Sequence, residues 1–410
     1  MAISFIINTL ISTAICDKNS SEIMENNMRL NNCYNIETLR KRAKAQLPSP
    51  MFHYIDGGAG DEITLRRNTS AFDKYALIPN YLTDVSNVDI SSTLMGRDID
   101  WPMMAAPTGM NRLFHHDREL GVARAAKRSG TFLGLSTVAS SSIEDVAAEN
   151  DGPKMYQLYV FKERSMTESM IEACKISGYD AICLTVDTVI AGNRERDIMT
   201  GMTLPPKFTP SSLLSFASRP TWVYKALTER TFSLPNILNH GGHLISEHAS
   251  LTAFIDNQFD KSINWEDVKW LRSIWDGKLV LKGIHSVHDA KKAAECGADA
   301  IMISNHGGRQ LDSVPAAIEC LPEIKAAVGD QMELILDGGI RRGIHMIKAL
   351  ALGADAVSIG KSYLYGLAAD GEAGVDKAFD ILKTEFTRDM MLLGCSKVSD
   401  INEDHVRLFD

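Results

Sequence analysis

Short apolar segments, each followed by a polar residue or a glycine, recur eight times from residue 100 onward. The segments are Met103–Ala106, Phe132–Leu135, Met155–Leu158, Ala181–Leu184, Leu279–Leu281, Ala300–Ile303, Glu333–Leu336 and Ala356–Ile359. Amphipathic helical patterns such as Val287–Glu295 and Pro315–Ala327 separate most of them. Strands that alternate with helices predict a parallel sheet, and eight such units predict an α/β fold closed into a TIM (β/α)8 barrel.

A repeated short motif supports this periodic organisation. Residues Gly297–Ile301 recur as Gly353–Val357 and, more loosely, as Gly178–Ile182. A glycine at the start of the motif fits the end of a helix that leads into a strand. An open, doubly wound sheet is the alternative fold, but no GxGxxG sequence follows the first strand.

The length of the chain is compatible with one large domain. The chain has 410 residues, of which 45% are hydrophobic, and a barrel routinely uses 250 or more residues as a single domain. We therefore predict one barrel domain over residues 31–410, with an N-terminal helical segment. Residues 1–30 are predicted to be a disordered leader, or to precede a true start at Met24 or Met28. A signal peptide is the alternative, although no basic residue precedes the apolar run.

Charge and cysteine content exclude some classes of partner. The net charge is −9 and no block of basic residues occurs, which argues against nucleic acid as a partner. The seven cysteines are scattered without CxxC spacing, at Cys16, Cys33, Cys174, Cys183, Cys296, Cys320 and Cys395. They predict free thiols in a reducing compartment, with neither disulfides nor a metal site.

A polar group or a glycine follows every predicted strand. In a barrel these positions meet at one face, where active sites of this fold are built. In chain order they are Pro107-Thr108-Gly109, Ser136-Thr137, Gln157 with Tyr159, Thr185 with Asp187, Lys282, Ser304 to Arg309, Asp337-Gly338-Gly339 and Gly360-Lys361. About two of these tips are expected to be helix N-caps instead, with Ser136, Thr185 and Asp337 as the candidates.

The segment Ser304–Asp312 carries the strongest chemical signal. It places His306 and Arg309 three residues apart on a glycine-rich turn. Imidazole is suited to proton transfer near neutral pH, and a guanidinium can hold a carboxylate through two parallel hydrogen bonds. Asp187 can orient and support an imidazolium on the histidine. The pattern predicts a site that removes a proton from a small acid; the alternative is an ordinary surface turn.

Two further segments indicate an anion site. Asp337–Gly343 follows a strand and opens a helix, and Gly360-Lys361 offers the same arrangement after the last strand. Backbone N–H groups at helix starts bind anions, and barrels commonly place phosphate sites in these last two loops. A phosphorylated cofactor or substrate is therefore expected, unless these are turn glycines beside solvated arginines.

Two basic residues have alternative interpretations. Lys282, at the end of its strand, is either a Schiff-base nucleophile or a fixed positive charge. If the cofactor is a flavin, such a cation would stabilise its anionic reduced form. Arg194 is a second candidate for holding a carboxylate, or part of a solvated run of charges.

A long insertion, residues 201–260, interrupts the pattern between the fourth and fifth strands. Its basic residues Lys207, Arg219, Lys225 and Arg230 lie among aromatic residues and leucines. This mixture is compatible with contact to a membrane interface, with an active-site lid, or with a subunit contact.

Over roughly residues 33–408, the chain resembles the FMN-dependent L-2-hydroxy acid dehydrogenases and oxidases, which include glycolate oxidase, L-lactate dehydrogenase and mandelate dehydrogenase. The motifs that carry the resemblance are Tyr54–Glu62, Thr64–Asn68, Ala106–Gly109, Gln157–Tyr159, Leu184–Thr188, Lys282-Gly283, Ser304–Asp312 and Asp337–Gly343.

The resemblance assigns roles to individual residues. It implies that His306 is the base and Asp187 its partner. It implies that Arg309 and Arg194 bind the substrate carboxylate, and that Tyr54 and Tyr159 hydrogen-bond the substrate oxygens in catalysis. FMN would be bound by Pro107, Thr108, Gly109, Ser136, Gln157, Thr185, Lys282, Ser304, Asp337, Gly338, Gly339, Ile340, Arg341, Gly360 and Lys361. His306 would take a proton from Cα or from the hydroxyl, so carbanion and hydride transfer both stay open.

Departures from the family pattern bear on the subtype. Val138 stands where glycolate oxidases tend to have tryptophan, and Gly109 stands where oxidases often have alanine. Lys361 replaces a usual arginine, which keeps the charge but loses bidentate geometry. The resemblance therefore implies a dehydrogenase that oxidises L-lactate, or an aromatic acid such as L-mandelate, to the 2-oxo acid and reduces a quinone-type acceptor. A soluble oxidase that reduces O2 to H2O2 is the alternative.

The resemblance also implies partners and location. Residues 201–260 are similar in length and character to the membrane-associating loop of mandelate and bacterial lactate dehydrogenases, which implies a cytoplasmic protein peripheral to the inner face of the membrane. A homo-oligomer, a tetramer in this family, is expected. A flavin barrel of the isopentenyl diphosphate isomerase kind is the competing class, and a non-catalytic phosphate-binding barrel is another. His306 with Arg309 and Arg194 argues against both.

Overall fold

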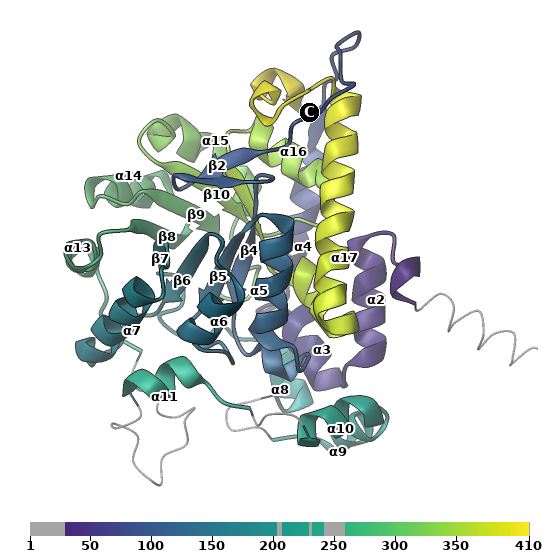
Figure 1. Cartoon of the computed structure of the whole chain (residues 1–410), viewed down its shortest axis with the longest axis vertical. Coiled ribbons are helices and arrows are strands. Elements are labelled where there is room, and N and C mark those ends of the chain that lie inside the picture. The colour runs from purple at the N-terminus through teal and green to yellow at the C-terminus, as the bar shows by residue number, and fades with distance from the viewer. Residues whose placement is uncertain (1–28, 203–206, 229–231, 242–258, 410) are drawn as a thin grey trace, which may run out of the picture.

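A closed barrel of eight parallel strands forms the centre of the computed structural model, which describes residues 29–202, 207–228, 232–241 and 259–409 (Figure 1). The strands are β4 (Met103–Thr108), β5 (Phe132–Ser136), β6 (Lys154–Leu158), β7 (Ala181–Thr185), β8 (Lys278–Ile284), β9 (Ala300–Ser304), β10 (Glu333–Asp337) and β11 (Ala356–Ile359). Around the barrel their order is β10-β11-β4-β5-β6-β7-β8-β9. The predicted barrel and its eight strands are confirmed.

Helices cover the outside of the barrel. They are α5 (Arg118–Ser129), α6 (Ile143–Glu149), α7 (Arg164–Ile176), α13 (Trp265–Ile274), α14 (Val287–Glu295), α15 (Ala317–Val328), α16 (Gly343–Ala351) and α17 (Lys361–Leu393). The repeated glycines Gly178, Gly297 and Gly353 follow helices α7, α14 and α16 with φ of +66°, +77° and +99°. A residue with a Cβ is strained in this left-handed conformation, which explains why glycine recurs there.

A hairpin closes one mouth of the barrel. It consists of β2 (Ser92–Leu94) and β3 (Arg97–Ile99), seen across the top of Figure 1. Its residues Leu94, Met95 and Ile99 are buried against barrel side chains such as Met104 and Met302. The hairpin thus covers the amino ends of the strands and leaves the carboxyl-end mouth open.

The predicted N-terminal helical segment is present. It contains η1 (Leu30–Asn32), α2 (Ile36–Gln46), α3 (Ser49–Asp56), α4 (Ile63–Ser70) and η2 (Ala71–Lys74). Helix α2 packs along α17, and β1 (Tyr75–Leu77) pairs with β12 (Val406–Leu408), which follows η5 (Val398–Asp400) and η6 (Glu403–His405). These contacts bring α3 to the open mouth. The leader predicted over 1–30 lies almost entirely outside the described residues, and the division into a leader and one domain stays a prediction.

The insertion after β7 contributes four short helices at the open mouth (Figure 1). They are α8 (Glu195–Thr200), α9 (Pro210–Ala217), α10 (Pro220–Thr228) and α11 (Pro235–Gly241); residues 203–206, 229–231 and 242–258 of the predicted insertion lie outside the described residues. The Ser49 N–H donates to Ser215 Oγ at 2.8 Å, and Trp222 Nε1 donates to the Leu113 carbonyl at 3.2 Å. Among the described helices, none has the length and apolar character needed to cross a membrane.

Candidate active site

A cavity of about 660 Å³ opens at the carboxyl ends of the strands. Residues that follow all eight barrel strands line it, together with residues of α3 and α4. Of the predicted site residues, all line the cavity except Thr185, Asp187 and Ser304. Those three lie directly behind it, where they hydrogen-bond Gln157, His306 and Lys282 respectively. The structure thus brings the whole predicted set together.

His306 lies on a turn in which three consecutive residues have left-handed backbone. The φ angles of His306, Gly307 and Gly308 are +57°, +65° and +73°. The His306 N–H donates to Ser304 Oγ at 3.0 Å, and its ring Nδ1 lies 2.9 Å from Asp187 Oδ1. Such backbone strain is typical of functional sites. Because Nδ1 faces the carboxylate, Nε2 is the ring nitrogen left for a ligand in the cavity.

The electrostatic surroundings keep His306 neutral. Burial and the nearby Lys282 ammonium lower the pKa of His306, and the Asp187 carboxylate only partly opposes them. Burial favours the neutral form of Asp187, but the His306 and Lys282 charges hold the pKa of that carboxyl well below its usual range. At neutral pH the pair is therefore a neutral imidazole beside a carboxylate, which can accept a proton and then be stabilised as an ion pair.

Lys282 is a buried cation that is held in place by two neighbours. Its Nζ donates to Ser304 Oγ at 3.0 Å and lies 3.5 Å from Asp337 Oδ2, while Ser304 Oγ donates to the same Asp337 oxygen at 2.6 Å. Burial opposes the charge, but the Asp187 and Asp337 carboxylates raise the pKa of Lys282 above its ordinary value. A protonated amine is not a nucleophile, so this arrangement favours the fixed positive charge over the Schiff-base alternative.

Two arginines flank the ring of Tyr54. The guanidinium carbons of Arg194 and Arg309 lie 5.4 Å and 4.8 Å from the ring centroid. Arg309 donates to the Tyr54 and Gly57 carbonyls, and Arg194 lies 3.3 Å from Asp197. Burial, with repulsion from Arg194, lowers the pKa of Arg309. The excess positive charge makes this part of the cavity a site for an anion.

Tyr159 is a protonated hydrogen-bond donor at the cavity. Burial raises the pKa of Tyr159 well above its ordinary value. Its ring stacks on Phe259, with centroids 4.9 Å apart. The Tyr159 hydroxyl can therefore donate to an oxygen of a bound ligand.

The far end of the cavity is formed by the loops after β10 and β11. Gly338 and Gly339 have φ of +114° and +79°, and a Cβ at Gly339 would lie 1.9 Å from the Asn68 carbonyl. Arg341 donates to Ser362 Oγ at 3.3 Å, at the start of α17. By contrast, Lys361 Nζ donates to the carbonyls of Gly57 and Gly307 at 3.2 Å and 3.0 Å. Backbone N–H groups and Arg341 are thus the better placed groups for an anion here.

We predicted that about two of the eight tips are helix N-caps, and the candidates Ser136, Thr185 and Asp337 are wrong. Thr185 Oγ1 accepts from Gln157 Nε2 at 2.7 Å, and Asp337 accepts from Ser304. The helices after β5, β7 and β10 have later N-cap residues, at Ser142, Arg194 and Arg342. Several residues separate each of these strands from the start of the next helix. The three side chains therefore lie at the cavity or directly behind it, and not at a helix start. Of the tips, Gly360 is the N-cap of α17.

Several bracing residues were not predicted to have a role. Asn68 Nδ2 donates to Asn305 Oδ1 at 2.8 Å, and Asn305 Nδ2 donates back to Asn68 Oδ1 at 2.7 Å. Gln310 Nε2 donates to the Asp187 carbonyl at 2.9 Å. The Thr64 N–H donates to Asp312 Oδ1 at 2.8 Å. These contacts fix the His306 turn to α4 and to the segment after β7.

An apolar wall of the cavity was also missed, apart from Val138. It comprises Met110, Leu113, Phe114, Val138, Met202, Phe232, Leu234 and Phe259. Gly109 is fitted to this wall, because a Cβ there would lie 2.5 Å from Val138 Cγ2. Apolar residues in loops and helices carry no sequence signal that separates a pocket wall from ordinary core.

Comparison with known proteins identifies the family. A family model described as FMN-dependent dehydrogenase matches residues 43–408. The chain belongs to this family. Its cofactor is therefore FMN, and its chemistry is the oxidation of a 2-hydroxy acid, an oxidoreductase reaction on a CH–OH group.

Relatives of the chain include both oxidases and dehydrogenases. Glycolate oxidase 3 of Arabidopsis thaliana is 39% identical over 373 residues, which cover 91% of this chain and 95% of the relative. A peroxisomal (S)-2-hydroxyacid oxidase of the same plant is also 39% identical, over 91% and 96% of the two chains. The solved structure of a monotopic membrane protein, (S)-mandelate dehydrogenase, has a TM-score of 0.87 at 35% identity and covers 92% of this chain and 100% of its own.

The cavity fits FMN. A buried ammonium, that of Lys282, faces into it beside the polar side chains of Ser136 and Gln157. At the other end, Gly338, Gly339 and Gly360 line the cavity next to two helix starts, and the lack of side chains at these positions lets a phosphate approach the backbone closely.

Proposed function

We propose that this FMN-dependent dehydrogenase oxidises an L-2-hydroxy acid with an apolar side chain, with an aromatic acid such as L-mandelate as the best substrate and L-lactate as a smaller one. The electrons pass to a quinone-type acceptor. The apolar wall of the cavity is the observation that carries the choice of substrate.

The binding mode follows from the charges of the cavity. The substrate carboxylate lies between Arg309 and Arg194, which neutralises a region with excess positive charge. Tyr54 and Tyr159 donate hydrogen bonds to the substrate oxygens. The substrate side chain then packs on Leu113, Phe114 and Val138 or on their neighbours across the cavity.

The cofactor is held by the strand ends. Pro107, Thr108, Gly109, Ser136, Gln157 and Lys282 would hold its ring system, with Thr185 and Ser304 supporting Gln157 and Lys282 from behind, and Asp337 to Arg341 with Gly360 and Lys361 would hold its phosphate. When bound, FMN supplies a two-electron acceptor. Lys282 holds a positive charge next to it, which stabilises negative charge that develops on reduction.

The chain's own catalytic groups move the proton. His306 Nε2 would accept one of the two protons that the substrate loses, and the two electrons and the second proton would pass to the bound FMN as the 2-oxo acid forms. Asp187 Oδ1, 2.9 Å from Nδ1, stabilises the resulting imidazolium. A proton taken from Cα and a proton taken from the hydroxyl both fit this arrangement.

The burial of the substrate side chain sets how strongly L-mandelate should be preferred over glycolate. Complete burial of a side chain the size of phenylalanine contributes about 1.5–3 kcal/mol, which corresponds to roughly a tenfold to hundredfold change in kcat/KM. Glycolate has no side chain to bury against the wall. We therefore expect kcat/KM for L-mandelate to exceed that for glycolate by at least about tenfold.

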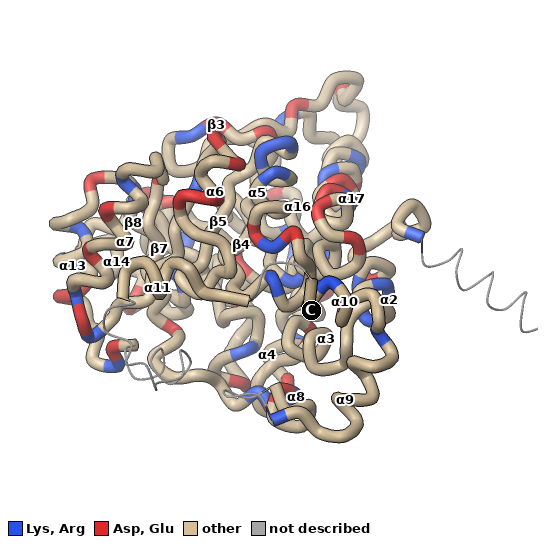
Figure 2. Tube along the Cα trace, turned by 60° about the horizontal axis from the view of Figure 1, so that its bottom comes forward, with Lys and Arg blue, Asp and Glu red and all other residues tan. Residues whose placement is uncertain are grey.

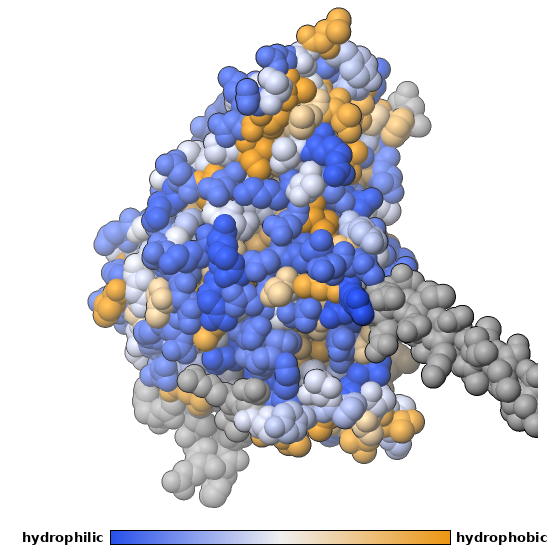
Figure 3. Space-filling view, turned by 45° about the vertical axis from the view of Figure 1, so that its right-hand side comes forward, coloured by the Kyte–Doolittle hydropathy of each residue, from blue (hydrophilic) through white to orange (hydrophobic). Residues whose placement is uncertain are grey.

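A membrane surface fits helices α9 and α10. On α9, Leu213 and Leu214 are 58% and 72% exposed, and on α10 Tyr224 and Leu227 are 67% and 80% exposed. Figure 2 shows few charged residues on these helices, and Figure 3 shows apolar surface at the bottom of the molecule, where Figure 1 places them. Exposed apolar patches of this kind mark interaction sites. We place this surface on the inner face of the cytoplasmic membrane, close to the quinone.

An oxidase that uses O2 is the second candidate function, because the 39% identical relatives are oxidases by name. The two functions share one half-reaction and differ in the acceptor. We also propose a homo-oligomer, a tetramer as the resemblance implies, which light scattering of the purified protein tests.

Steady-state kinetics distinguishes these possibilities. L-mandelate, L-lactate and glycolate are compared at saturating concentrations of a soluble quinone analogue, and separately in air with peroxide detection. The proposal expects L-mandelate to give the highest kcat/KM and the quinone analogue to outpace O2. A preference for glycolate overturns the substrate assignment, and stoichiometric peroxide at full rate in air establishes the oxidase.

A further inference from the structure

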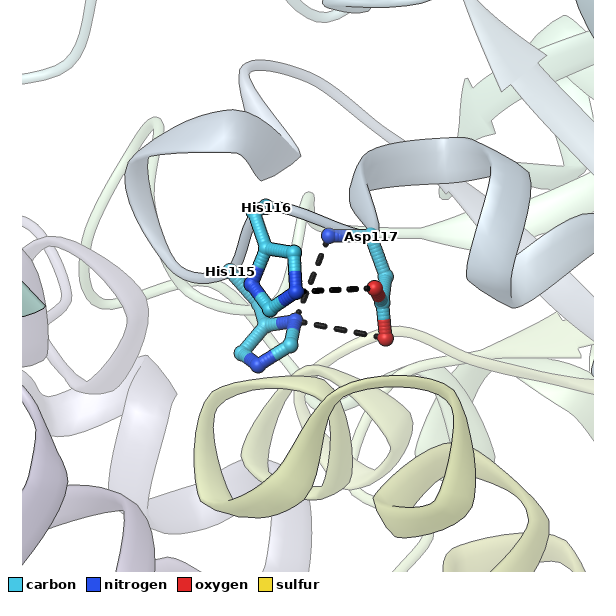
Figure 4. A group of neighbouring side chains, drawn as sticks. All are labelled: His115, His116 and Asp117. Carbon is cyan, nitrogen blue, oxygen red and sulfur yellow. Dashed lines mark hydrogen bonds and ion pairs between the residues drawn. The ribbon is translucent and has the colours of Figure 1, made fainter. Parts of the chain in front are cut away.

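We propose that His115, His116 and Asp117 form a binding site for Zn²⁺, separate from the active site. The three residues connect η3 (Asn111–Leu113) to α5. Their side chains converge, with the two imidazole rings beside each other and the carboxylate facing both (Figure 4). The sequence predicted no metal site, because the scattered cysteines lack the spacing of metal ligands.

Each histidine presents a ring nitrogen to a different oxygen of the Asp117 carboxylate, at a separation close to that of two ligands of one metal ion. The Asp117 N–H also donates to His115 Nδ1 at 3.2 Å, a hydrogen bond that Zn²⁺ binding would replace. His115 Nδ1 lies 3.3 Å from Asp117 Oδ2, and His116 Nε2 lies 3.4 Å from Asp117 Oδ1. One nitrogen or oxygen atom from each residue lies within 4.8 Å of the others. Ligands about 2.0–2.1 Å from a tetrahedral Zn²⁺ lie about 3.3 Å from each other. The observed separations are also longer than the 2.7–2.9 Å typical of a charge-assisted hydrogen bond.

The donor set selects the class of metal. Two imidazole nitrogens and one carboxylate suit Zn²⁺ and its neighbours in the first transition series, whereas Mg²⁺ and Ca²⁺ prefer oxygen ligands alone. The three side chains are 19%, 26% and 25% exposed, so the ion has access from solvent and water can complete the coordination. This exposure matches a site that exchanges its metal.

Helix α17 provides the support behind the three ligands. The Glu372 N–H donates to Asp117 Oδ2 at 2.8 Å, which fixes the carboxylate. The preceding Gly371 has φ of +59° at a kink in α17, and a Cβ there would lie 2.2 Å from Asp117 Oδ2 and 2.4 Å from His115 Cε1. The kink thus makes room for the ligands, and glycine is required at this position.

A metal at this place would order the segment that leads into α5. That segment directly follows Leu113 and Phe114, which line the apolar wall of the active-site cavity. An ion bound here would therefore hold this part of the chain in its folded conformation and raise the temperature of unfolding, because it binds the folded state preferentially.

Calorimetric titration of chelator-treated, flavin-loaded protein with ZnCl₂ tests the proposal. We expect one equivalent to bind to the wild-type chain, and His116→Asn to weaken that binding by at least about tenfold, since loss of even an outer-shell partner costs 10- to 100-fold. His288→Asn is the matched control, because His288 is an exposed histidine on α14. Equal affinity in wild type and His116→Asn, or loss of binding in the control, would overturn the proposal.

A second measurement does not depend on a variant. Crystals of the wild-type protein exposed to ZnCl₂ should give an anomalous scattering peak between the two imidazoles and the carboxylate. If anomalous peaks occur at other sites and none occurs here, the three residues form only a hydrogen-bonded cap for α17, and the proposal is wrong.

Discussion

Burial is unusual in opposite ways in two regions, the open mouth of the barrel and the exposed face of helices α9 and α10. At the mouth, Gln157, Lys282 and Ser304 are polar yet at most 3% exposed. On the helices, Leu214 and Leu227 are apolar yet 72% and 80% exposed. The buried polar groups are compensated by hydrogen bonds within the protein, whereas exposed apolar patches mark sites of interaction with a partner. The first region serves the reaction, and the second serves a partner, so their effects should be separable by mutation.

The largest effect is expected at the mouth, from His306→Gln. Glutamine keeps a polar side chain of similar length but cannot take a proton. The rate of flavin reduction by the hydroxy acid should fall by about 10⁴-fold, the upper range for a general base. Stopped-flow absorbance under anaerobic conditions measures the rate. The variant should purify with its flavin, because the residue supplies no essential cofactor contact; a variant with near-normal rate would show that His306 is not the base.

The next largest effect is expected from Asp187→Asn. The amide cannot stabilise an imidazolium as the carboxylate does, so kcat should fall by about 10³-fold.

The pH dependence of the two proteins gives a second, independent readout. Since only neutral His306 accepts a proton, kcat/KM is lost as pH falls through its pKa, which lies below that of a free imidazole. Asp187 raises that pKa, so its removal should move the acid limb of the profile to lower pH. An acid limb that moves to higher pH in the variant would contradict the assigned pairing.

The sequence was sufficient to predict the elements that make the mouth. Each barrel strand is an apolar run long enough to cross the barrel, and for β9 the predicted Ala300–Ile303 differs from the observed Ala300–Ser304 by one residue. The predicted polar tips converge because parallel strands place their carboxyl ends together. The N-caps could not be predicted, since loop length between strand and helix depends on packing.

The sequence did not predict the contacts between residues that lie far apart in the chain. Asn68 and Asn305 pair across 237 positions of the chain. The apolar wall combines Phe114 with Leu234 and Phe259, residue types that occur in any core. Only folding brings these residues to one cavity, so substrate size was predicted through Val138 alone.

A smaller effect is expected at the apolar wall of the cavity. Val138→Trp should fill the space next to Gly109 and lower kcat/KM for L-mandelate by roughly tenfold to hundredfold, the loss of about 1.5–3 kcal/mol of side-chain burial. The value for glycolate should change much less. Thermal unfolding of the variant checks that overpacking has not destabilised the fold. Equal losses for the two substrates would argue against the wall as the side-chain pocket.

The smallest effect on catalysis is expected on α9. Leu213→Glu with Leu214→Glu should leave kcat/KM with a soluble acceptor within about twofold, since surface changes away from the site alter little. Binding to anionic lipid vesicles, measured by flotation, should be lost, because each buried leucine contributes about 1.5–3 kcal/mol. Leu392→Glu, at a residue 66% exposed on α17, is the control and should bind vesicles as wild type does. Retained binding in the double variant would place the membrane surface elsewhere.

The most direct test of the central claim is the anaerobic addition of an L-2-hydroxy acid to the purified, flavin-loaded protein. The account predicts that L-mandelate and L-lactate bleach the visible flavin absorbance in a single turnover, that their D-enantiomers do not, and that air restores the colour slowly. If neither L-acid bleaches the flavin, the cavity does not oxidise these acids and the proposed function is wrong.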